Sequence, residues 1–62
     1  MYRIYIQDRG IRLWLLDWIA SNGLEHPQFT TKHDHAMIFL RFDAALYYHT
    51  RLRTMGYEPH ID

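Results

Sequence analysis

The chain has no cysteine, only three glycines and two prolines in 62 residues, and no net charge. Without cysteine, neither a disulfide nor a thiolate metal site can support the fold. Seven Lys/Arg against seven Asp/Glu argue against the basic composition of a dedicated nucleic-acid binder and the acidic composition of a nucleic-acid mimic. There is no run of about 18 apolar residues, so no transmembrane helix is predicted. We expect a single cytoplasmic domain, residues 1–62, without membrane contact.

Aromatic residues are abundant, at 16% of the chain. A domain of this length buries only about 60% of the surface of its unfolded chain. Its core therefore rarely supplies more than about 3–5 kcal/mol. The composition leaves two sources of additional stability open: an aromatic-rich core and oligomerisation.

The first half of the chain reads as a strand followed by a helix. Residues 2–7 alternate between apolar and polar, as expected for a strand with one buried face. Residues 11–22 carry apolar side chains at helical spacing, and Asp8 precedes them as a possible N-cap. The run Ser21-Asn22-Gly23-Leu24 has the form of a helix C-cap that ends in glycine.

The second half reads as two strands, a helix and a short strand. Residues 28–32 and 36–42 are predicted strands, joined around His33-Asp34-His35. Asp43 is then the expected N-cap of a helix that ends before Gly56. Residues 57–62 form a last strand, which Pro59 places at a sheet edge.

This order predicts an α+β fold of the ferredoxin-like βαββαβ type. Two helices would cover one face of a four-stranded antiparallel sheet with its first and third strands at the centre. The opposite, uncovered face is the predicted partner-binding surface, with Arg3, Tyr5, Met37, Phe39 and Arg41. A second interaction patch is predicted on the outer side of the first helix, with Leu13, Leu16 and Ala20.

The first loop and helix resemble those of an ACT domain, a small regulatory module of amino-acid metabolism. The resemblance rests on Asp8-Arg9-Gly10 before the helix, on Leu15, Trp18, Ile19 and Ala20 at its apolar positions, and on Gly23 at its end; residues 52–58 also look like the end of such a domain. It implies binding of an amino acid or a similar small molecule at a dimer interface. The implied ligand loop is Asp8, Arg9 and Gly10.

A second resemblance is to an RNA-recognition motif. Ile4-Tyr5-Ile6-Gln7-Asp8 looks like the shorter signature of that family, and residues 36–42 overlap the longer one. The resemblance implies that bases of single-stranded RNA stack on Tyr5, with Arg3 and Arg41 near phosphates. Because the charge is balanced, we do not expect nucleic acid to be the main partner.

Few residues have a pattern typical of catalysis or metal binding. The one compact metal-like cluster is His33-Asp34-His35, which we interpret as a polar turn, because zinc requires three or four ligands. No nucleophile stands in a recognisable catalytic context and no glycine-rich phosphate loop is present. We therefore expect no metal, no cofactor and no enzymatic activity.

These observations favour a binding module that acts by protein–protein contact. Its partner would be a second copy of the chain or a larger protein, as for a small phage-type modulator of a host factor. Two alternatives remain open: a dimer that senses a small molecule, as the first resemblance implies, and a binder of single-stranded RNA, as the second implies.

Overall fold

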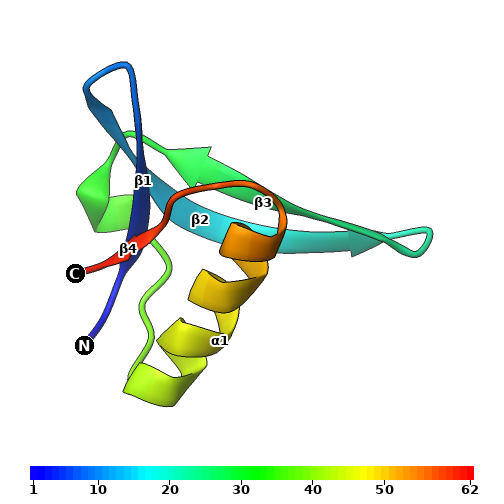
Figure 1. Cartoon of the computed structure of the whole chain (residues 1–62). Helices are drawn as coiled ribbons and strands as arrows, with labels where there is room; N and C mark the ends of the chain where they lie inside the picture. Colours follow the sequence, from blue (N-terminus) through cyan, green and yellow to red (C-terminus); the bar gives the residue numbers. More distant parts are fainter.

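The computed structural model describes residues 1–62 and contains four strands and one α-helix (Figure 1). The elements are β1 (Ile4–Asp8), β2 (Ile11–Ser21), β3 (Leu24–Thr30), a 3-10 turn η1 (His33–His35), α1 (Phe42–Thr54) and β4 (His60–Ile61). The strands form one antiparallel sheet in the order β3-β2-β1-β4, and α1 packs on one of its faces. The predicted α+β class, the four-stranded antiparallel sheet and the central first strand are confirmed. The two-helix ferredoxin-like arrangement is not found.

The helix predicted over residues 11–22 is instead the long central strand β2. Two consecutive residues have positive φ before it, Arg9 at 55° and Gly10 at 81°, and two after it, Asn22 at 54° and Gly23 at 76°. Positive φ at both central residues is the mark of a two-residue type I′ hairpin turn, for which Asn-Gly is a preferred sequence. Gly23 therefore closes a hairpin and does not cap a helix.

An irregularity in β2 explains why its apolar residues fall at helical spacing. Leu15 is paired with Phe29 and Asp17 with Gln28, so that Leu16 is an extra residue in a β-bulge. The bulge shifts the alternation by one residue, and Trp18 as well as Leu15 comes to face α1. The Trp18 ring lies 5.3 Å from that of Tyr48. A strand whose two-residue alternation is interrupted by a bulge can therefore carry apolar side chains at the 3.6-residue spacing of a helix.

The long β2–β3 hairpin is tied to α1 near its middle and extends beyond the helix (Figure 1). Arg51 forms an ion pair with Glu25, and its guanidinium carbon lies 5.7 Å from the centre of the Trp18 ring. Trp18 Nε1 donates to Glu25 Oε1 at 3.4 Å. Pro27 lies within β3, which is an edge strand, as expected for a residue that lacks a backbone donor.

The predicted strand over residues 36–42 is also absent. This segment crosses the sheet as extended chain, fixed by a single bridge in which Tyr2 and Phe39 exchange two backbone hydrogen bonds of 2.8 Å each. The Met37 amide donates to the Leu15 carbonyl at 2.8 Å, beside the bulge. The segment therefore packs against the sheet without joining it as a strand.

The second predicted helix is confirmed as α1, together with its glycine C-cap. The Tyr57 amide donates to the Leu52 carbonyl at 3.1 Å and the Gly56 amide to the Arg53 carbonyl at 3.0 Å, the two bonds of a Schellman motif. Gly56 has a φ of 100°. The predicted N-cap is wrong, because Arg41 is the N-cap residue and Asp43 lies inside the first turn.

The core lies between α1, the crossing segment and the two central strands. It is the cluster Ile4, Leu15, Phe39, Ala45 and Leu52. Only nine of the 62 residues are buried, so each core side chain carries a large share of the stability. The last strand is limited to β4, which pairs with β1 at the sheet edge, as Pro59 predicted.

Candidate functional site

The sheet face opposite α1 is covered by its own side chains. Tyr5 is the cross-strand partner of both Trp14 and His60, and its ring centre lies 5.0 Å from each of their rings. The Arg12 guanidinium carbon lies 4.2 Å from the centre of the Tyr5 ring, within cation–π distance. Tyr5 is therefore half-buried, and the prediction that nothing covers it is wrong.

Trp14 lies at the centre of the aromatic cluster on this face and is only 5% exposed. The His33 ring of η1 is nearly perpendicular to the indole, with the two ring centres 4.6 Å apart. His33 therefore packs on an indole, and its ring nitrogen lies 3.7 Å from the exposed Asp34 carboxylate. No group of three or more His, Cys, Asp or Glu side chains in the chain is placed to hold a metal ion.

The five residues of the predicted partner-binding surface are not brought together. Phe39 is a core residue, 7% exposed, and its ring lies 5.4 Å from that of Tyr48 on α1. Met37 is half-buried and packs against the same core cluster. Side chains of this crossing segment alternate in the sense opposite to the prediction, because Phe39 points inward and Leu40 is 78% exposed.

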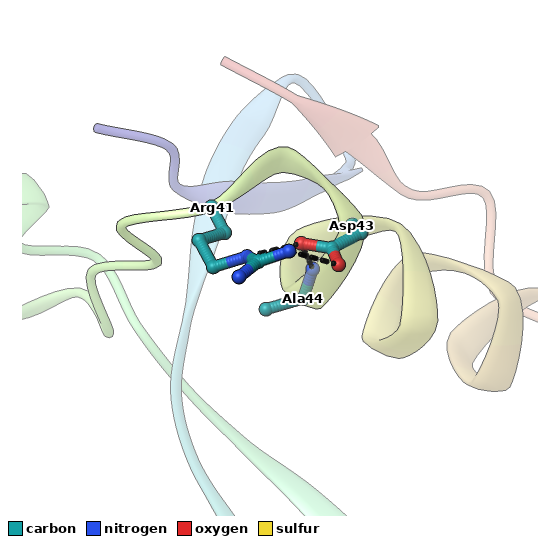
Figure 2. A network of polar contacts seen from close by, with 3 residues as sticks. All are labelled: Arg41, Asp43 and Ala44. Atoms are coloured by element: carbon teal, nitrogen blue, oxygen red, sulfur yellow. Dashed lines mark hydrogen bonds and ion pairs between the residues drawn. The ribbon is translucent and has the colours of Figure 1, made fainter.

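The two arginines expected to recognise a partner have different surroundings. Arg3 is half-buried, and its Nε is buried without a hydrogen-bond partner. Arg41 is exposed and forms a bidentate pair with Asp43, with Nε to Oδ1 and Nη2 to Oδ2 both at 3.0 Å. Figure 2 shows this pair at the start of α1, where Asp43 Oδ1 also accepts from the Ala44 amide.

The predicted second patch is spread along β2. Leu13 lies near one end of that strand, Leu16 is the bulge residue and Ala20 lies near the tip of the hairpin. At about 3.3 Å per residue, Leu13 and Ala20 are roughly 20 Å apart. These residues therefore form no continuous surface.

The predicted ligand loop is a tight hairpin turn, with Asp8 ending β1 and Ile11 starting β2. Arg9 and Gly10 occupy its two central positions. Asp8 does line a cavity of about 560 Å³, which lies between this end of the sheet and the loop that follows α1. Its lining includes Ile6 from β1 and Tyr57 from that loop.

The most exposed apolar group gathers at the start of α1, and the predicted sites did not include it. We name it the α1 patch; its members are Leu40, Phe42, Leu46 and Tyr47, which are 78%, 51%, 45% and 56% exposed. Phe42 and Leu46 are one turn apart on the same flank of the helix, and the Phe42 ring lies 5.4 Å from that of Tyr2. Helical spacing predicts a core stripe of Ala45, Tyr48, Leu52 and Met55, and Leu46 and Tyr47 fall outside it, which is the sequence signal for their exposure.

Comparison with known proteins finds no match: no protein-family model fits the chain, and neither a curated protein nor a solved structure is similar to it. No helix of the chain has the length and apolar character needed to cross a bilayer.

Proposed function

We propose that this protein is a non-enzymatic module that acts by protein–protein contact through the α1 patch, and that the occupant of the patch is a second copy of the chain. The observation that carries the proposal is the exposure of four large apolar side chains within eight residues, Leu40 to Tyr47. Apolar side chains gathered in this way on a small surface are typical of an interaction site.

The charges within the α1 patch favour a second copy over an unrelated partner. Arg41 and Asp43 lie between Leu40 and Leu46 along the chain and form an ion pair with each other (Figure 2). In a two-fold symmetric contact, each surface meets itself in reverse. Arg41 of one copy can then face Asp43 of the other, so that the patch complements itself. Because the formal net charge of the chain is zero, there is no overall repulsion between copies.

Size limits the strength of this contact. A stable interface buries at least about 1,000 Å² in total, and four side chains supply only part of that area. The neighbouring rings of Tyr2 and Tyr48, which contact the patch, would form its rim. We therefore expect a dimer with a dissociation constant in the micromolar range or weaker.

The test is the solution mass of the protein by sedimentation equilibrium, from about 10 μM to 1 mM. The wild-type chain should pass from monomer to dimer, and Leu46→Asp should remain a monomer. Leu24→Asp is the matched control, because Leu24 is a similarly apolar and 73% exposed residue at the hairpin end of β3 and is not a member of the α1 patch. A wild-type chain that stays monomeric at 1 mM, or equal behaviour of the two variants, contradicts the proposal.

A charge exchange tests the two-fold arrangement itself. Arg41→Asp and Asp43→Arg should each weaken self-association, because each places like charges opposite each other. An equimolar mixture of these two variants should form mixed dimers more strongly than either variant forms its own. If mixing restores nothing, Arg41 and Asp43 do not face each other across the contact.

A further inference from the structure

The cavity beside the β1–β2 turn is a second feature, separate from the α1 patch. Its lining includes residues 56–58, which belong to the loop that runs from the C-terminal end of α1 toward β4 (Figure 1), whereas the patch lies at the start of the helix. Its volume of about 560 Å³ falls within the range of small-molecule sites, roughly 300–1,000 Å³. Ligand binding in this cavity would not require self-association through the α1 patch.

Four of the eight residues that line the cavity are apolar or aromatic. Ile6, which is 8% exposed, lines it together with Leu13 and Phe29, all on the side of the sheet that faces α1. The Tyr57 ring lies 5.4 Å from the Phe29 ring at an angle of 58°. Part of the cover over these side chains comes from the loop that follows α1, through Tyr57, and not from the helix itself.

Charge is present in the lining with one sign only. Asp8 and Glu58 are the charged residues among the eight that line the cavity, and none of the eight is Lys, Arg or His. Neither carboxylate takes part in an ion pair within the chain, whose ion pairs are His33–Asp34, Arg41–Asp43 and Arg51–Glu25. A bound cation would be the first partner of either carboxylate.

We infer that this cavity binds a small organic cation, an amine with an apolar or aromatic body. The body would occupy the space above Ile6 and Phe29, and the ammonium group would lie between Asp8 and Glu58. The Tyr57 ring adds a face with which a cation interacts favourably. An anion of the same shape is repelled by both carboxylates, and a neutral analogue gains only the apolar contact.

The probe is 2-phenylethylamine, with 2-phenylethanol as a neutral analogue of nearly the same shape and phenylacetate as an anionic one. Binding is followed by chemical shifts of the backbone amides, with Gly56 and Tyr57 as reporters. Because exposed ion pairs are modest in strength, we expect the amine to bind about tenfold more tightly than the alcohol, a ratio that corresponds to 1.4 kcal/mol. Phenylacetate should not bind.

The matched variants separate charge from shape. Asp8→Asn combined with Glu58→Gln should abolish the preference, so that the amine and the alcohol bind with about equal affinity. Asp34→Asn, which removes an exposed carboxylate outside the cavity, should leave the preference unchanged. Equal binding of amine and alcohol to the wild-type chain overturns the inference. So does the absence of shifts at the two reporter amides at 10 mM amine.

Discussion

The backbone of Arg9 offers the sharpest test of the hairpin that replaced the predicted helix. Arg9 has a φ of 55° at the first central position of the β1–β2 turn, and its side chain takes part in no hydrogen bond or ion pair. The left-handed conformation costs most residues about 1–2 kcal/mol, whereas asparagine adopts it more readily. Arg9→Asn creates the preferred Asn-Gly turn with Gly10 and should raise the free energy of unfolding by about 0.5–1 kcal/mol.

The matched control is Arg9→Ala, which removes the same charge and side chain but keeps the backbone strain. It should leave stability within about 0.5 kcal/mol of the wild type. Urea unfolding followed by the fluorescence of Trp14 and Trp18 measures both variants. Because about 1 kcal/mol shifts the melting temperature of a domain this small by about 4–8 °C, Arg9→Asn should melt about 2–8 °C higher. Asparagine no better than alanine would refute the turn geometry.

Three further predictions concern the core, the C-cap and the aromatic cluster. Leu52→Ala should lower the free energy of unfolding by about 2–5 kcal/mol, which is most of the stability expected for a core of this size. Leu40→Ala, at an exposed position, should change it by less than about 0.5 kcal/mol. Urea unfolding of both variants measures the difference. Gly56→Ala should cost about 1–2 kcal/mol through its positive φ alone, because nothing lies within 4 Å of the added Cβ; calorimetry would show a lower melting temperature, and no change would argue against the Schellman cap. Arg12→Ala should cost about 0.5–1 kcal/mol and increase the access of acrylamide to tyrosine, while an unaltered quenching rate would show that the guanidinium does not cover Tyr5.

The sheet face opposite α1 shows how so small a domain shields both faces of its sheet with only one helix. Arg12 and His60 lie over Tyr5, and the His33 ring packs nearly perpendicular to that of Trp14. Long and planar side chains shield the aromatic rings here, so that no second layer of backbone is needed. For a base to stack on Tyr5, as the RNA-recognition resemblance implies, the Arg12 guanidinium would have to leave the ring.

The exposed residues of the crossing segment differ from the predicted ones for a geometric reason. Side chains in extended chain alternate from one face to the other, so the placement of a segment by one residue decides whether Phe39 or Leu40 is buried. Residues 36–42 carry apolar side chains on both alternations, and the sequence pattern alone favours neither. The backbone hydrogen bonds of this segment to Tyr2 and to the Leu15 carbonyl fix the orientation in which Phe39 is buried and Leu40 is exposed.

Two elements follow from local sequence alone: β1, with its alternating isoleucines, and α1, with its apolar stripe and Gly56 cap. In these two segments, local pattern and local turn chemistry agree. Tertiary structure decided β2, because a bulge at Leu16 gave a strand the apolar spacing of a helix, and because Asn22-Gly23 suits both a helix end and a hairpin. It also decided the candidate sites, since the α1 patch and the cavity exist only where a single helix covers part of the sheet and leaves the rest to side chains.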